Sequence, residues 1–325
     1  MKEIYSRSKS VWQRMNARER KAAMAYGEKY KAFLDTARTE RLAAAEIIRR
    51  AEEKGFKPVY TMKSLKAGDK VYWNQKDKSV ILAVIGKEPV HEGIKIVGSH
   101  IDSPRLDLKA NPVHEQDGIV YFRTHYYGGI KKYQWTCIPL ALIGVVFTKD
   151  GKKVDINIGL KDSDPVFYVS DLLIHMAQDQ MKKTLAEGIT GEQLQAVAGT
   201  HSEEGQTPKD AIMALLKKEY GIEEEDFAAA ELELVPATKS RDVGFDRSLI
   251  ASYGQDDRVC SYANLEAILD AKPGVKTQAA LLTDKEEIGS YGNTGMESSY
   301  FVKFVMKLLA LQGQESLLDF YETME

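Results

Sequence analysis

Gly93-Ile-Lys-Ile-Val-Gly98-Ser-His-Ile-Asp-Ser-Pro104 combines a strand-like run with an abrupt stop. We expect a buried strand that ends at His100 and Asp102. Side chains two residues apart in an extended backbone lie on the same side. His100 can therefore bind a metal ion while Asp102 hydrogen-bonds the other imidazole nitrogen and fixes its tautomer. The stretch predicts a metal-ligand pair at one edge of an α/β sheet.

Two acidic clusters occupy similar positions further along the chain. Asp256 and Asp257 precede the helical run that ends near Asp270, and Glu286 and Glu287 follow a strand-like run over 277–283. Open α/β sheets place their sites where strands end and helices begin. Together with the His-x-Asp pair, these clusters predict a hydrolytic metal centre.

Each cluster taken alone also has an ordinary explanation. Short motifs such as His-x-Asp occur by chance. Asp256 and Asp257 are typical of a solvated helix start, and Glu286-Glu287 resembles the surface run Glu223–Glu225. Only the shared position at strand and helix ends favours the metal centre.

The residue types suit a hydrolase with paired metal ions. Zinc accepts imidazole nitrogen and carboxylate oxygen, and a carboxylate such as that of Asp256 can bridge two ions. Adjacent glutamates in an extended loop point apart, so one can bind metal while the other remains a free base. A free glutamate beside a metal-activated water can take its proton and deliver it to a leaving amine.

Composition limits the other possibilities. The net charge of −3 over 325 residues gives no reason to expect a nucleic-acid or membrane partner. Cys137 and Cys260 are the only cysteines, which excludes a disulfide framework. The chain has no signal-peptide pattern and no apolar run of membrane-spanning length. We expect a soluble cytoplasmic protein.

The order of patterns predicts an α/β protein whose first domain is interrupted. We expect a catalytic α/β domain from residues 1–109 and 241–325, with a β-rich insertion over 110–240. Thr36 is a candidate helix cap, and Leu42, Ala45, Ile48 and Ala51 are expected on the apolar face of the following helix. Further helices are expected over 170–183, from 207–208, over 259–270 and over 296–312. Strands are expected over 70–74, 79–86, 118–123, 141–147, 154–158, 231–235 and 277–283, with the run ending at residue 98 beside 79–86.

Three ordered motifs carry a resemblance to a known family. Val97–Lys109, Gly254–Cys260 and Asp284–Ser290 resemble the aspartyl aminopeptidase and vacuolar aminopeptidase I family of dinuclear zinc exopeptidases. The likeness includes Asp242–Ser248 and runs over nearly the whole chain. It implies a zinc-exopeptidase-like mixed sheet flanked by helices, with an inserted β-rich dimerisation domain that mediates assembly into dodecamers.

The resemblance also implies roles for particular residues. His100 and Glu287 would each bind one of two divalent ions, zinc with cobalt or manganese as alternatives, and Asp256 would bridge them. Glu286 would be the general base. Asp102 would be the partner of His100. His175, in Asp171–Met176, would reach the site of a neighbouring subunit and polarise the scissile carbonyl.

The chain departs from the family pattern at its C-terminal end. Family members are longer and supply two further ligands, an Asp and a His, whereas this sequence ends at Glu325 before either motif. Asp319 and Glu297 lack the expected surroundings. If the protein ends here, we expect weak metal binding and little activity.

The leading hypothesis is a metallo-aminopeptidase that removes N-terminal residues from peptides. A deacylase or carboxypeptidase could use the same metal centre, and it would differ in not requiring a free substrate amine. A catalytically impaired or non-catalytic assembly subunit is the alternative from another class. Activity assays combined with a size measurement separate these hypotheses.

Overall fold

The first sheet of the computed structural model places the predicted metal-binding segments at one edge. Residues 9–314, 316, 318, 320 and 323 are described. The sheet has five strands in the order β1-β2-β3-β14-β4. The strands are β1 (Lys57–Pro58), β2 (Lys70–Gln75), β3 (Ser79–Val84), β4 (Ile94–His100) and β14 (Thr277–Thr283). β14 pairs antiparallel with β3 and parallel with β4, which makes the sheet mixed as expected.

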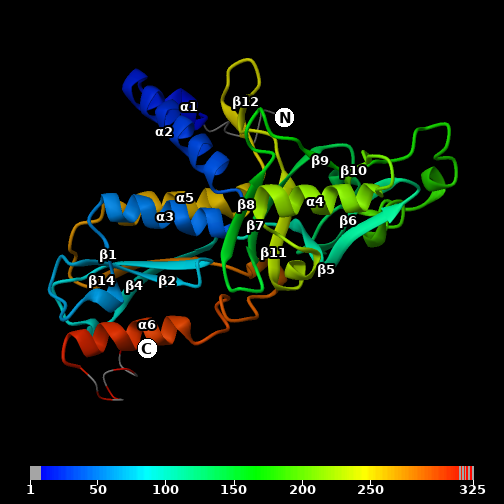
Figure 1. The fold of residues 1–325 in the computed structure, drawn as a ribbon. Coiled ribbons are helices and arrows are strands. Elements are labelled where there is room, and N and C mark those ends of the chain that lie inside the picture. Colours follow the sequence, from blue (N-terminus) through cyan, green and yellow to red (C-terminus); the bar gives the residue numbers. More distant parts are fainter. Residues whose placement is uncertain (1–8, 315, 317, 319, 321–322, 324–325) are drawn as a thin grey trace, which may run out of the picture.

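Helices cover both faces of this sheet and form three layers (Figure 1). The covering helices are α2 (Ala17–Thr36), α3 (Glu40–Glu53), α5 (Gln255–Leu269) and α6 (Tyr300–Leu311), whereas α1 (Val11–Arg14) has no buried residue. α2, α3 and α5 pack on the face formed by Val80, Leu82 and Val84. α6 packs on the opposite face, against Ile81 and Ala83. Successive side chains of β3 therefore pack into two hydrophobic cores on opposite faces of the sheet, and every residue of β3 is buried.

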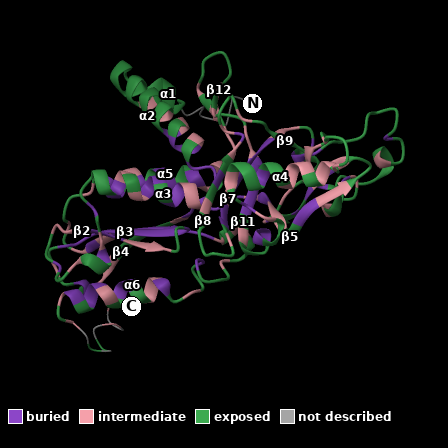
Figure 2. Cartoon of the chain, viewed as in Figure 1, coloured by how far each residue is buried: buried purple, intermediate pink, exposed green. Residues whose placement is uncertain are grey.

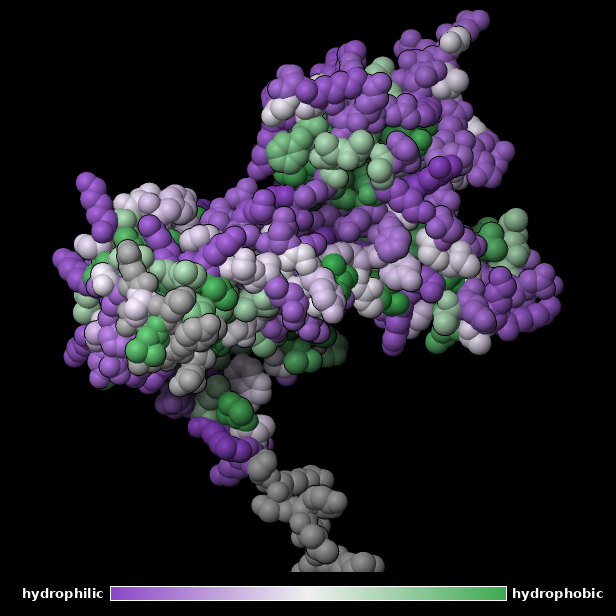
Figure 3. Space-filling model, turned by 90° about the horizontal axis from the view of Figure 1, so that it is seen from below, coloured by the Kyte–Doolittle hydropathy of each residue, from purple (hydrophilic) through white to green (hydrophobic). Residues whose placement is uncertain are grey.

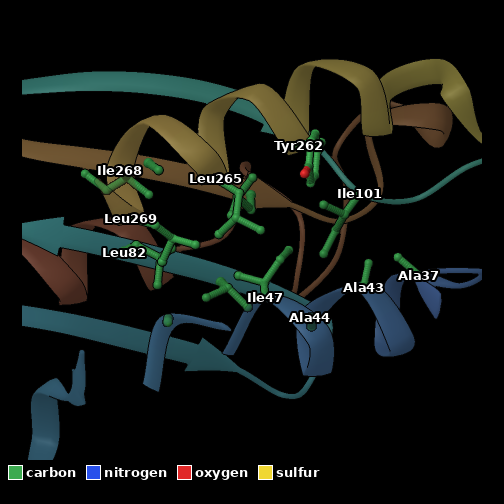
Figure 4. Packing of buried hydrophobic residues seen from close by; sticks show 14 of the residues in the cluster. Ala37, Ala43, Ala44, Ile47, Leu82, Ile101, Tyr262, Leu265, Ile268 and Leu269 are labelled. Carbon is green, nitrogen blue, oxygen red and sulfur yellow. The ribbon is translucent and has the colours of Figure 1, made fainter. Parts of the chain in front are cut away.

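Small apolar residues allow α3 to lie close to its neighbours. Ala43, Ala44 and Ile47 of α3 are fully buried. In Figure 4, Ile47 lies between Leu82 of β3 and Leu265 of α5. Of the predicted face, Ala51 is fully buried, Leu42 and Ile48 are partly buried and Ala45 is exposed, so the buried face is centred about one position away.

The cap of α3 also differs from the prediction. Thr39 accepts a hydrogen bond from the backbone N–H of Leu42 at 3.3 Å, whereas Thr36 is the last residue of α2. A side-chain oxygen at the N-cap satisfies one of the free N–H groups of the first turn. The predicted helix is therefore present, but its N-cap is Thr39, three residues after Thr36.

The second sheet is built from the middle of the chain. It has seven strands in the order β11-β5-β6-β10-β9-β7-β8, and β11 also pairs with β7. The elements are β5 (Arg105–Gln116), β6 (Ile119–Tyr127), β7 (Pro139–Phe147), β8 (Lys153–Ile158), β9 (Phe167–Tyr168), β10 (Ala196–Gly199), α4 (Pro208–Tyr220) and β11 (Ala230–Pro236). Its purple core strands lie beside those of the first sheet in Figure 2.

Short elements complete the fold. A hairpin of β12 (Arg241–Val243) and β13 (Leu249–Ala251) projects from the molecule (Figure 1). Short 3-10 turns cover Val59–Thr61, Val90–Glu92, Lys132–Trp135, Gln180–Lys182, Gly191–Gln193, Glu224–Ala229 and Glu286–Ile288. In the space-filling view, hydrophilic residues dominate and hydrophobic ones form scattered patches (Figure 3). Among the residues described, no helix has both the length and the apolar composition needed to cross a bilayer.

Two expectations about individual elements were wrong. β4 neighbours β14 instead of β3, and it lies at the edge of the sheet with Ile96 and Val97 exposed. The expected buried strand is therefore an edge strand. The segment 170–183 forms turns instead of a helix. Its apolar side chains, such as Leu173, are exposed, so tertiary packing does not stabilise a helix there.

Candidate metal centre

Parallel pairing brings two of the predicted segments together. His100 of β4 and Thr283 of β14 are register partners in neighbouring parallel strands. The chain then turns at Asp284 and Lys285 into the short 3-10 turn Glu286–Ile288. Because parallel strands end at the same edge of a sheet, His100 meets the double glutamate there.

α5 brings the third segment to the same edge. Ser261 of α5 donates a hydrogen bond to the backbone oxygen of His100 at 2.7 Å, and Asn264 donates to that of Val97 at 3.0 Å. The helix is therefore fixed along β4. Asp256 and Asp257 at its start have non-helical backbone angles, and their peptide bond is cis. The side chain of Asp256 is 88% exposed and points out of the protein core.

The imidazole of His100 has acidic groups on both sides. Its Nε2 lies 3.4 Å from Oδ1 of Asp256 and 3.5 Å from Oε2 of Glu286. Its Nδ1 lies 3.3 Å from Oδ1 of Asp102 and 3.1 Å from the Asp102 backbone oxygen. In the neutral ring, donation from Nδ1–H to the Asp102 backbone oxygen would leave the lone pair of Nε2 facing Asp256 and Glu286.

This arrangement changes the acid–base properties of the pair. Burial of the ring favours the neutral form, but the hydrogen bond and charge of Asp102, with Glu286, raise the pKa of His100 to about 9. Burial also opposes the charge on Asp102, yet the hydrogen bonds from His100 and Tyr127 lower its pKa. Without a metal ion the site therefore attracts positive charge as a proton.

Glu287 joins this cluster through its backbone and its electrostatic surroundings. Its backbone N–H donates to Oδ2 of Asp102 at 3.2 Å. Burial, followed by the charge of Asp102, raises the pKa of Glu287; the charge of Asp256 adds to this shift, whereas the charge of His100 opposes it. Gly128 lies against the side chain, since a Cβ built on it would be 3.1 Å from Oε2 of Glu287.

The donor chemistry fits a zinc ion in part. One imidazole nitrogen and nearby carboxylates are the nitrogen and oxygen donors that zinc accepts, and Asp102 is the second-shell carboxylate expected behind a metal-binding histidine. Yet within residues 9–314 and the four described beyond them, no group of three or more His, Cys, Asp or Glu side chains is spaced to hold an ion by itself. His100, Asp256 and Glu286 are close together but do not form a complete ligand shell.

His175 is not part of this cluster. It is exposed in the turn-forming segment 171–176, beside Leu173 and Met176, each of which is 71% exposed. No contact of His175 with the candidate metal ligands is found in the single chain. Its predicted role requires a second subunit, so that role stays a prediction.

Sequence reasoning missed Tyr127, which donates a hydrogen bond to Oδ2 of Asp102 at 2.8 Å. Tyr127 lies 25 residues beyond Asp102 at the end of β6, and no motif spacing connects the two. In the same stretch, His125 is exposed and stacks on Tyr126, with ring centroids 5.3 Å apart. A tyrosine that follows a predicted strand is the only sequence signal for this contact.

Comparison with known proteins identifies the family. Residues 33–324 match the family model described as aminopeptidase I zinc metalloprotease (M18). An M18 family aminopeptidase 1 of Clostridium acetobutylicum is 46% identical over 313 residues, which cover 94% of this chain and 67% of the relative. The crystal structure of an M18 aminopeptidase from Thermotoga maritima has a TM-score of 0.90 and 41% identity, covering 96% of this chain and 68% of that chain.

A more distant structure shares the fold. The Saccharomyces cerevisiae mApe1 dodecamer has a TM-score of 0.68 at 17% identity, covering 88% of this chain and 66% of that one. The present chain thus spans about two thirds of the length of these proteins. The matched residues include the three motifs that meet at the edge of the first sheet. The chain belongs to the M18 family of zinc metallo-aminopeptidases, as the resemblance implied.

Proposed function

We propose that this protein removes N-terminal residues from peptides at the edge of the first sheet. The observation that carries the proposal is the contact of His100 Nε2 with both Asp256 and Glu286 within 3.5 Å. His100, Asp256 and Glu287 would hold two divalent ions, with Asp256 between them. Zinc agrees with the family description, and cobalt and manganese suit similar ligands.

A cleft beside Asp256 gives the peptide a place to bind. It has a volume of about 590 Å³ and runs from Ser103 and Asp256 to Ile130, Lys131 and Trp135. A larger cleft of about 740 Å³, lined in part by Gly159, Lys161 and Tyr253, contains none of the proposed ligands. We assign the peptide to the smaller cleft because it alone of the two adjoins a proposed ligand.

Glu286 is proposed as the general base. When bound, the ions would acidify a water and polarise the scissile carbonyl. The carboxylate of Glu286 faces the same side of His100 as Asp256, so it can accept the proton of that water. It can then deliver the proton to the amine that leaves. Asp102 keeps the His100 ring oriented throughout.

The test measures cleavage of aminoacyl substrates with and without a chelator. Chelation is expected to abolish activity, and Glu286→Gln is expected to lower kcat by about 10²–10⁴-fold. Glu204→Gln removes an exposed glutamate from a polar loop and should leave kcat unchanged. Chelator-resistant cleavage, or full activity of Glu286→Gln, would contradict the mechanism. Equal cleavage of N-acetylated substrates would favour a deacylase or carboxypeptidase instead.

We also propose that the chain assembles through the segment that contains His175. Leu172, Leu173, Ile174 and Met176 are all more than half exposed, and a contiguous apolar segment of this kind is typical of an interface. In an assembly, His175 would reach a neighbouring site and polarise the substrate carbonyl. The residues 110–240 would form the assembly domain, as a dimer or as a dodecamer.

Light scattering tests this assembly. Leu173→Asp is expected to lower the measured mass to that of a single chain, whereas Leu215→Asp, at another exposed leucine, should not. His175→Ala should keep the mass and lower kcat. A wild-type protein that is a single chain with full activity would rule out a role for His175 across subunits.

We also propose that the protein is located in the cytoplasm. Cys137 and Cys260 are both unpaired and exposed. Exposed free thiols are compatible with a reducing compartment, where structural disulfides are rare. Fractionation of the source cells, with the protein found outside the cytoplasmic fraction, would contradict this location.

A further inference from the structure

Asp102 connects the proposed ligand His100 with the loop that carries Glu286 and Glu287. The carboxylate is fully buried and contacts four donors. Its Oδ1 faces Nδ1 of His100 at 3.3 Å and accepts from the backbone N–H of Glu286 at 3.2 Å. Its Oδ2 accepts from the backbone N–H of Glu287 at 3.2 Å and from the hydroxyl of Tyr127 at 2.8 Å. Asp102 therefore holds both parts of the site: its carboxylate binds the glutamate loop and faces the imidazole, whose Nδ1 also contacts the Asp102 backbone oxygen at 3.1 Å.

Tyr127 makes the shortest of these four contacts, and it comes from the second sheet. It lies at the end of β6 and is 7% exposed. Burial, followed by the charge of Asp102, raises the pKa of Tyr127. The hydroxyl therefore remains protonated and acts as the donor to the carboxylate.

The ring of Tyr127 is itself held in place. The guanidinium carbon of Arg105 lies 3.6 Å from the ring centroid. Nε of Arg105 is 2.8 Å from Asp107 and 3.3 Å from Glu233, and Nη1 is 3.4 Å from Glu40. Glu40 belongs to α3 on the first sheet, whereas Glu233 belongs to β11 in the second. Rotation of Tyr127 would disturb this buried set of charges.

We propose that Tyr127 is a positioning residue for the metal centre. It contacts neither the proposed ions nor the substrate. It holds the Asp102 carboxylate beside Nδ1 of His100, which also contacts the Asp102 backbone oxygen, so that Nε2 points toward the ion. The inference rests on the proposed metal-binding function and deepens it, because it makes the geometry of the site depend on the second sheet.

The expected size of the effect follows from the chemistry of such partners. Loss of a group that orients a metal-binding histidine lowers metal affinity by about 10–100-fold. Tyr127 acts one hydrogen bond further away, and three other donors still hold Asp102. We therefore expect a loss at the lower end, about tenfold, when the hydroxyl alone is removed.

The experiment titrates the purified metal-free chain with Co²⁺ and follows visible absorption, with Zn²⁺ competition as a second measure of affinity. Tyr127→Phe is compared with Tyr72→Phe. Tyr72 is 5% exposed and donates a hydrogen bond to a carboxylate, that of Glu52, at 2.7 Å. Both variants lose the hydroxyl of a buried tyrosine that donates to a carboxylate, although the carboxylate of Glu52 is exposed and that of Asp102 is buried. Only Tyr127→Phe should bind Co²⁺ about tenfold more weakly and shift its absorption bands.

The outcomes separate the inference from the proposed function. Equal Co²⁺ affinity and equal spectra for Tyr127→Phe and the wild type would overturn the positioning role while leaving the metal centre intact. An equal loss in Tyr72→Phe would assign the effect to general destabilisation and also overturn it. Absence of Co²⁺ and Zn²⁺ binding by the wild type would overturn the proposed metal centre and the inference together.

Discussion

At the scale of single residues, Gly128 determines how closely β6 approaches the glutamate loop. Its φ of +72° is unfavourable for residues with a Cβ, and an added Cβ would lie 3.1 Å from both Cβ and Oε2 of Glu287. We predict that Gly128→Ala displaces Glu287 and weakens Co²⁺ binding. The positive φ adds a stability cost of about 1–2 kcal/mol.

Gly118→Ala is the matched control for this change. Gly118 has a φ of +75°, and a Cβ there would meet nothing within 4 Å. Both variants should therefore lose similar stability in urea unfolding, and only Gly128→Ala should lose Co²⁺ affinity. Similar affinities in the two variants would show that contact with Glu287 does not matter.

The candidate metal-site residues could be predicted from the sequence because few residue types can bind a metal ion. His100, Asp102 and Asp256 were selected because imidazole and carboxylate groups stood at expected chain positions, and the structure brings them together. Tyr127 was missed because its contact depends on how β6 meets the first sheet, which no local spacing encodes.

At the scale of elements, α3 carries a buried acid whose ionisation depends on two arginines. Burial opposes the charge on Glu46, but hydrogen bonds from Arg49 and Arg50, of 2.6–2.8 Å, lower its pKa below the ordinary value of 4.5. A lowered folded-state pKa stabilises the protein above the unfolded pKa, and this stabilisation is lost as pH falls through the folded value.

We therefore predict a pH-dependent effect of Glu46→Gln. At pH 7 it should reduce the free energy of unfolding by about 1.5–3 kcal/mol, the size of a charge-assisted hydrogen bond. The difference from the wild type should shrink below about pH 4.5. Glu53→Gln, which removes a 64% exposed partner of the same Arg49, should have little effect at any pH. A difference that grows in acid would contradict the assigned sign.

Element prediction succeeded where local signals agree with packing. Thr207 caps α4 and Pro208 begins it, as their order in the sequence predicted. The helix expected over 170–183 failed because apolar side chains alone do not show what they will pack against. The start of α6 was also misplaced, because the helix begins at Tyr300, four residues later than expected.

At the scale of the whole molecule, buried charges join the two sheets. Arg105 lies between Glu40 of α3 and Glu233 of β11, and all three side chains are at most 6% exposed. Removing one partner of a buried ion pair leaves uncompensated charge and costs about 3–5 kcal/mol. We predict a loss of this size for Arg105→Met, measured by urea unfolding.

A surface pair provides the control. Lys239 and Asp162 are 3.0 Å apart, but their side chains are 59% and 92% exposed. Lys239→Met should change the free energy of unfolding by less than about 1 kcal/mol. Comparable losses in the two variants would mean that Arg105 does not hold the sheets together.

The α/β class and the family were predictable from sequence, whereas the arrangement of strands was not. The family resemblance implied a mixed sheet, and the order of residue patterns indicated a β-rich middle segment. The division at residues 110 and 240 stays a prediction. Insertion of β14 between β3 and β4 joins strands about 190 residues apart in sequence, and hydrophobic pattern does not specify such pairing.

The position of β4 has a practical consequence for anyone who purifies this protein. Its outer side offers backbone groups for pairing, and Ile96 and Val97 are 44% and 59% exposed. An exposed apolar edge strand of this kind can pair with a strand of another molecule and cause association. Stock solutions should therefore become turbid or form soluble aggregates as the concentration rises, and Val97→Lys should raise the concentration at which this begins without contacting the imidazole three residues away.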